Sequence, residues 1–107
     1  MTPSYSPSKP ITKEEALQYD PTALQADTEK REKNIKIFET TIETEKNGIK
    51  ENMHMMSVID HSHPEYKTLE ENIKKKEANI KMFDEAIFEE RRQIDRDLQM
   101  IALIKAN

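Results

Sequence analysis

The sequence has no cysteine, no tryptophan, a single glycine and no long apolar run. The lack of cysteine excludes disulfides, thiolate nucleophiles and zinc sites built on thiolates. No apolar stretch approaches the roughly 18–20 residues that a helix needs to cross a bilayer. The N-terminal segment MTPSYSPSKP also lacks the apolar stretch of a signal peptide. These absences predict a soluble, cytoplasmic protein with no membrane partner.

Charged residues are unusually abundant at 36% of the 107 residues, and hydrophobic residues make up only 35%. Typical domains have roughly 25% and 45–50% respectively. A chain of this composition cannot build a thick core, so it is either disordered or made of long, thin helices. The 21 acidic and 17 basic side chains are interleaved. Because phosphate contacts require clustered Lys and Arg, this mixture predicts no nucleic-acid partner.

The N-terminal part carries signals for an arm and a short helix. Three prolines and three serines among the first ten residues predict a flexible Pro/Ser-rich arm over 1–11. A capping box follows, in which the Thr12 hydroxyl accepts from the amide of Glu15 and the Glu15 carboxylate reaches back. This pattern predicts a short helix over 12–19.

Two further signals predict a helical hairpin over 20–107. Asp20-Pro21 is typical of an N-cap followed by the first helical residue, so a long helix is expected to start there. No proline follows until the turn expected near 60–63. A second capping box at 62–65 (SHPE), with Ser62 as the cap, then predicts the start of another long helix.

The two long helices carry related sequences. Residues 34–42 (NIKIFETTI) and 79–87 (NIKMFDEAI) are nearly the same phrase, 45 positions apart. Apolar residues recur at alternating spacings of three and four, which is the heptad pattern of coiled coils. The stripe of the first helix, moved by 45 positions, becomes the stripe of the second. The predicted seam core comprises Leu24, Ile35, Phe38, Ile42, Ile49, Met56, Ile59, Tyr66, Leu69, Ile73, Ile80, Phe83, Ile87, Ile94 and Ile101.

A turn centred near 62.5 brings the two stripes into antiparallel register. Residues whose numbers add up to 125 then face each other, so that Leu24 meets Ile101 and Ile42 meets Phe83. Every stripe position finds a stripe position opposite. The sequence therefore predicts an all-α fold, an antiparallel helical hairpin of two heptad-patterned helices preceded by a short N-terminal helix.

One dipeptide inside the first long helix is ambiguous. Asn-Gly, as at 47–48, is a strong hairpin-turn signal. Glycine inside a helix also destabilises it by about 1 kcal/mol relative to alanine. Since the heptad pattern continues through Gly48 in phase, we expect a helix with a soft point or slight bend there.

Five charged residues occupy stripe positions: Asp97, which repeats the polar Asn52, and Arg31, Glu45, Lys76 and Glu90. On the register above, each of the last four faces an isoleucine. Because an unpaired buried charge is strongly destabilising, these side chains are expected to reach solvent or a neighbouring chain. Two interpretations follow: a narrow, hydrated seam, or polar positions that set register and partner choice.

Apolar residues outside the seam predict a further contact. A single thin hairpin buries little apolar surface, so we expect self-association, with a dimer closing into a four-helix bundle. Cover by the N-terminal segment is the alternative. The candidate partner or dimer surface comprises Ile37, Met53, Met55, Met82, Phe88, Leu98, Met100 and Leu103.

The sequence has few candidate residues for catalysis or metal binding. His54, His61 and His63 lie near the expected turn, but their spacing matches no strong metal pattern. No nucleophile beside a base and no glycine-rich phosphate loop is recognisable. We therefore expect no enzyme activity, metal or cofactor. The predicted function is a non-enzymatic coiled-coil interaction or assembly module whose partner is protein; the alternative is a small adaptor or inhibitor that binds a larger protein through an exposed helix face.

Overall fold

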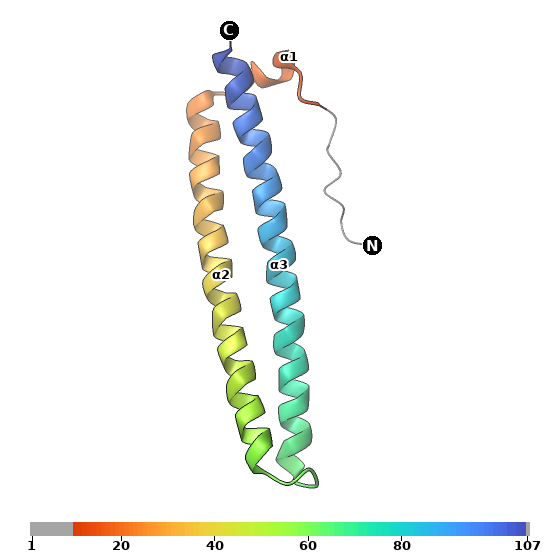
Figure 1. The fold of residues 1–107 in the computed structure, drawn as a ribbon. Helices are drawn as coiled ribbons and strands as arrows, with labels where there is room; N and C mark the ends of the chain where they lie inside the picture. Colours follow the sequence, from red (N-terminus) through yellow and green to blue (C-terminus); the bar gives the residue numbers. More distant parts are fainter. Residues whose placement is uncertain (1–9, 107) are drawn as a thin grey trace. The chain divides into compact units, whose positions relative to one another are not determined.

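The computed structural model describes residues 10–106, of which 87% are helical. It contains α1 (Lys13–Ala16), α2 (Pro21–Val58) and α3 (Pro64–Lys105), and no strand occurs within these residues (Figure 1). The predicted all-α hairpin with a short N-terminal helix is confirmed. The arm predicted over 1–11 lies outside the described residues except for its last two positions.

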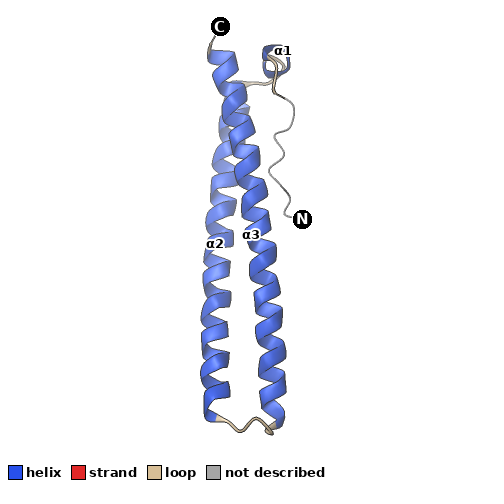
Figure 2. Ribbon diagram, turned by 45° about the vertical axis from the view of Figure 1, so that its right-hand side comes forward, coloured by secondary structure: helices blue, strands red, loops and turns tan. Residues whose placement is uncertain are grey.

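The chain forms two compact units, and each pairs a segment of α2 with an antiparallel segment of α3. Unit 1 contains the described residues up to Ile35 together with 88–106, and unit 2 is Lys36–Ile87. Unit 1 includes α1, the start of α2 and the end of α3. Unit 2 includes the loop that joins α2 to α3 (Figure 2).

The start of α1 follows the predicted cap, although the helix is shorter than expected. The amide of Glu15 donates to Thr12 Oγ1 over 3.2 Å. After Ala16 the α-helix ends in a turn, in which the amide of Tyr19 donates to the carbonyl of Ala16, three residues earlier. The residue before a proline disfavours helical geometry, so the approach to Asp20-Pro21 ends α1 before the predicted 12–19 is filled.

The long helices are capped by side chains immediately before a proline. At the start of α2, the amide of Thr22 donates to Asp20 Oδ1 over 3.1 Å, as predicted. At the start of α3 the predicted cap, Ser62, is wrong. The amide of Glu65 donates to His63 Nδ1 over 3.0 Å. Proline is preorganised for the first helical position, so Pro64 makes His63 the cap.

The predicted seam residues line the helix–helix contacts of the two units. None of the fifteen is exposed, and Leu24, Ile35, Ile42, Leu69, Ile87 and Ile101 are buried. In unit 2 the rings of Phe38 and Phe83, which occupy equivalent positions of the repeat, pack with centroids 5.8 Å apart. This contact lies one helical turn away from the predicted pairing of Ile42 with Phe83, because an aromatic side chain reaches along the seam.

Gly48 is helical, and its missing side chain makes room for a lysine. A Cβ atom at this position would lie 3.0 Å from both Cε and Nζ of Lys76. The Lys76 stem therefore crosses α2 where α2 has no side chain. The sequence predicts a weak point of the helix at Gly48, whereas in unit 2 this residue provides the space in which Lys76 packs.

Candidate functional sites

The seam charges of unit 1 pair within the chain, which corrects the prediction that they face only isoleucines. Arg31 Nε lies 2.8 Å from Asp27 Oδ2, and Arg31 Nη1 lies 3.1 Å from Glu90 Oε1. Asn34 also donates to Glu90, over 3.3 Å. The predicted register pairs only residues that lie directly opposite each other on the two helices. The long arginine instead reaches a carboxylate one turn along α3.

The same polar contact occurs independently in unit 2. Asn79 Nδ2 donates to Glu45 Oε2 over 3.3 Å. Asn79 and Glu45 occupy the repeat positions of Asn34 and Glu90, with the helices exchanged. The repeat therefore extends from the apolar stripe to the hydrogen bonds beside it.

Unit 1 also contains two neighbouring carboxyl groups, of which Asp97 is buried and Asp27 is half-buried. Asp97 is only 7% exposed and Thr28 only 2%. Thr28 Oγ1 donates to Asp97 Oδ2 over 3.5 Å. Burial, and after it the nearby Asp27 carboxyl, raises the pKa of Asp97 to about 7. The Asp97 carboxyl and then the Arg31 guanidinium lower the pKa of Asp27.

Sequence reasoning placed Asp97 on the stripe but missed its partner. Asp27 precedes stripe position 28 by one residue, so a heptad count leaves it out. A signal was present in the repeat, however. The positions equivalent to Asp27 and Asp97 are Asn72 and Asn52, a second pair of small polar residues.

The outer face of α2 in unit 2 is almost free of charge. Ten residues from 37 to 58 cover about 140° of the helix surface, at 100° per residue. Only one of the ten is Lys, Arg, Asp or Glu, whereas six of the other thirteen residues of 36–58 are Lys or Glu. One of these six, Lys36, has the angular position of His54 and therefore borders the surface at its N-terminal end. We call this surface the low-charge face; it consists of Ile37, Thr40, Thr41, Thr44, Asn47, Gly48, Glu51, His54, Met55 and Val58.

The threonines of the low-charge face satisfy their own hydroxyl groups. Thr40 and Thr41 each donate to the backbone carbonyl four residues earlier over 2.9 Å, and Thr44 does so over 3.1 Å. A shallow hollow lined by Lys36, Ile37, Thr40 and Thr41 lies on the same surface. Since the hydroxyls already have an acceptor, another protein could cover these side chains without leaving an unsatisfied donor.

The predicted partner residues do not all lie on exposed surface. Ile37, Met53, Met55, Met82, Phe88 and Leu98 are exposed. Met100 is 4% exposed, and Leu103 is half-buried. In unit 1 these two residues pack in a cluster with Ala16 and Ile11 of the N-terminal segment. The prediction that they form a free surface is wrong, because the short helix covers them.

The exposed predicted residues also occupy different sides of their helices. Ile37 and Met55 belong to the low-charge face, at the same angle on α2. Met53 is two residues from Met55, which at about 100° per residue places it on another side of the helix. It lines a hollow at the tip of unit 2 with Met56, Ser57, His61, Tyr66 and Ile73.

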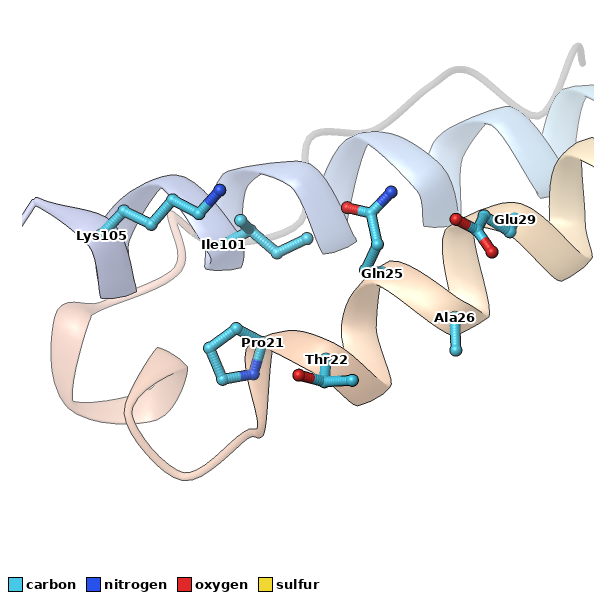
Figure 3. Close-up of a pocket in the computed structure, with 7 residues that line it drawn as sticks. All are labelled: Pro21, Thr22, Gln25, Ala26, Glu29, Ile101 and Lys105. Atoms are coloured by element: carbon cyan, nitrogen blue, oxygen red, sulfur yellow. The ribbon is translucent and has the colours of Figure 1, made fainter.

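Another hollow, in unit 1, has the features of an open groove (Figure 3). It is lined by Pro21, Thr22, Gln25, Ala26 and Glu29 of α2 and by Ile101 and Lys105 of α3. All its polar side chains are exposed. A ligand pocket normally has buried polar groups that converge on its occupant, and this groove has none among its lining residues.

Among residues 10–106, no group of three His, Cys, Asp or Glu side chains is arranged to hold a metal ion. None of the helices in this part of the chain combines the length and apolar character that a membrane span requires.

No protein-family model matches the chain, and no curated protein or solved structure matches it either. Two features stand out in the described residues: the low-charge face of unit 2, and the buried Asp97 of unit 1 with Asp27 beside it.

Proposed function

We propose that this protein is a non-enzymatic coiled-coil interaction module that self-associates through the low-charge face. The observation that carries the proposal is an exposed surface with one charged residue in ten, on a chain in which 36% of residues are charged. The central parts of protein–protein contacts are depleted in charged residues, as this surface is. The lack of cysteine supports a reducing, cytoplasmic setting for the module.

The repeat supplies an internal comparison for this surface. The positions equivalent to Met55 and Val58 are Met100 and Leu103. Met100 is covered by Ala16 and is 4% exposed, whereas Met55 is 50% exposed and Val58 is exposed as well. The second copy of the motif is thus covered by a helical segment. The first copy presents the same kind of side chain to solvent, which supports an intermolecular partner for it.

The shape and chemistry of the low-charge face favour a helix as that partner. Thr41 and Thr44 are small, so a second helix can approach closely, and Ile37 and Val58 provide larger apolar groups at the two ends. Packing two such faces together would join two hairpins into a four-helix bundle.

Sedimentation velocity over a concentration series tests this proposal directly. Wild type is expected to form a dimer whose dissociation constant rises at least tenfold in Met55→Glu, since one buried methionine contributes more than the 1.4 kcal/mol that a tenfold change requires. Met53→Glu is the matched control, because Met53 has the same side chain and similar exposure, 58%, but lies off the low-charge face. Equal effects of the two changes, or a wild-type monomer at all concentrations, would overturn self-association through this face.

A second candidate function has a specific observation in its favour. The cover on Met100 is a single short helix, α1, rather than a second hairpin. A short amphipathic helix of a larger protein could cover Met55 in the same manner, which would make this chain an adaptor or inhibitor. A monomeric wild type that binds such a protein, with binding lost in Met55→Glu and kept in Met53→Glu, would favour this function over self-association.

A further inference from the structure

The sulfur of this protein is held entirely in thioether side chains, because the sequence has six methionines and no cysteine. Among residues 10–106, the exposed methionines are Met53, Met55 and Met82, which have similar exposures. Met100, in contrast, is buried. Since a methionine must be reached by the oxidant to become a sulfoxide, we expect the first three residues to react with a peroxide and Met100 to be protected.

Only one of the three exposed methionines lies on the low-charge face. Met55 is one helical turn after Glu51 and one turn before Val58, which are both members of that face. Met53 lines the hollow at the tip of unit 2 instead, and Met82 belongs to α3. The described residues therefore contain one reactive thioether within the proposed contact surface and two outside it.

The surroundings of Met55 suit a thioether better than a sulfoxide. A methionine sulfoxide has a polar S=O group, which needs a hydrogen-bond donor when it is buried. The neighbours of Met55 along the face are Glu51 and Val58, and neither provides a side-chain donor, since a carboxylate only accepts. The threonine hydroxyls of the face already donate to backbone carbonyls. Covering an oxidised Met55 would therefore leave its oxygen without a donor from this stretch of α2.

The repeat shows the same side chain in a covered setting. Met100 occupies the position equivalent to Met55, and it packs in a buried cluster with Ala16. A methionine at this point of the motif is thus compatible with close packing under a helical segment, and the cover removes it from solvent. We expect the same relation at Met55, which is accessible in the free chain and covered in the proposed dimer.

We propose that Met55 is a reversible oxidation site that controls association through the low-charge face; this inference rests on the proposed self-association. The Met55 sulfur attacks one oxygen of hydrogen peroxide, so that an S–O bond forms and the O–O bond breaks. The departing hydroxide takes up the remaining peroxide proton and leaves as water. The thioether loses two electrons and the peroxide gains them. A methionine sulfoxide reductase with a thiol reductant removes the oxygen again as water and restores the contact surface.

Sedimentation velocity of the full chain before and after hydrogen peroxide treatment tests the inference, with each sulfoxide located by mass spectrometry of peptides. Peroxide should raise the dissociation constant of the wild-type dimer about tenfold or more, because a buried apolar contact is replaced by an unsatisfied polar group. Treatment with methionine sulfoxide reductases should restore the original value.

Two leucine variants assign the effect to one position. Met55→Leu conserves apolar volume, so it should form the dimer and keep it after peroxide treatment. Met53→Leu is the matched control, because it removes an equally exposed thioether and leaves Met55 in place. This control should lose its dimer on oxidation as wild type does.

The rate of oxidation at each position provides a second readout. Raising the protein concentration through the dissociation constant should slow the oxidation of Met55 and leave the rate at Met53 unchanged, since the dimer covers only Met55. A Met55 rate that is independent of concentration, a dimer that persists in oxidised wild type, or a dimer lost from oxidised Met55→Leu would overturn the oxidation site while self-association stands. A wild-type chain that is monomeric before peroxide would overturn both.

Discussion

Replacing Asp97 by asparagine should make the whole chain more stable at alkaline pH while leaving it nearly unchanged at mildly acidic pH. The pKa of Asp97 is raised from 3.8 to about 7 in the folded chain, so folding favours its protonated form. The stability that this group provides is complete below its unfolded pKa and is lost as pH rises through about 7. Asparagine mimics the protonated carboxyl at every pH and therefore removes this loss.

The magnitude follows from the size of the pKa shift. Each unit of difference between the folded and unfolded pKa corresponds to about 1.4 kcal/mol. Between pH 5 and about 7, Asp97 is protonated in the folded chain but not in the unfolded chain. Raising the pH from 5 to 8.5 therefore lowers the free energy of unfolding of the wild type by roughly 2–3 kcal/mol. The lowered pKa of Asp27 has the opposite sign, because its contribution is present above 3.8 and is lost only in acid. Because pH 5 lies above 3.8, Asp27 does not alter the change expected between pH 5 and pH 8.5.

Urea unfolding followed by circular dichroism at 222 nm measures this difference. Unfolding free energies of wild type and Asp97→Asn should diverge steadily between pH 5 and pH 8.5, with the variant more stable at the alkaline end. Asp95→Asn serves as the control, since it removes the same charge from an exposed position of the same helix. A gap between wild type and Asp97→Asn that is the same at both pH values would refute the assignment of the buried proton to Asp97.

Two further predictions concern the packing of unit 2. Gly48→Ala should raise the free energy of unfolding by about 0.5–1 kcal/mol, because alanine favours helix. The Lys76 atoms 3.0 Å from the new Cβ are the end of a flexible side chain and can move away. A lower melting temperature of the variant would mean that Lys76 cannot move. Phe38→Ala and Phe83→Ala should each lower the free energy of unfolding by about 3 kcal/mol. Their double-mutant cycle in urea should give a coupling of about 0.5–1.5 kcal/mol, and strict additivity would contradict the observed ring contact.

The helices could be predicted because their signals are local and repeated. Asp20 and Pro21 define the start of α2 without reference to any other part of the chain, and the heptad spacing depends only on helix geometry. The repeat doubles the number of positions that must agree with one register. The burial of Leu24 and Ile101 in unit 1 and of Ile42 and Leu69 in unit 2 follows from that pattern.

The side-chain pairing could not be predicted from the same pattern. A heptad register fixes where Cβ atoms lie, but Arg31 extends a full turn beyond its own layer to reach Glu90. Asp27 lies beside the stripe, so its contact with Asp97 depends on the direction of both side chains. The prediction of Ser62 as the cap was wrong for a different reason. Both Ser62 and His63 can cap a helix, and Pro64, which favours the first helical position, makes His63 the cap.

The outer surface was only partly predictable, since hydrophobicity alone does not tell what covers a residue. Met55 and Met100 occupy equivalent positions of the repeat and are equally apolar. One is exposed and the other is buried, because α1 is placed over Met100 by the turn before Asp20. That distinction depends on the path of the chain between α1 and α2, which local signals did not specify.

The two copies of the repeat agree where the hairpin needs them to agree and differ where it does not. Seam residues match because both units pack the same two helices in the same antiparallel manner. The outer faces are under no such requirement, and there the copies diverge: the exposed Thr44 on α2 corresponds to Glu89 on α3. Gly48 is a separate case, because it makes room for Lys76 within unit 2. An uncharged residue at 44 is what the proposed contact through the low-charge face requires, and the Met53→Glu and Met55→Glu pair is designed to detect that contact.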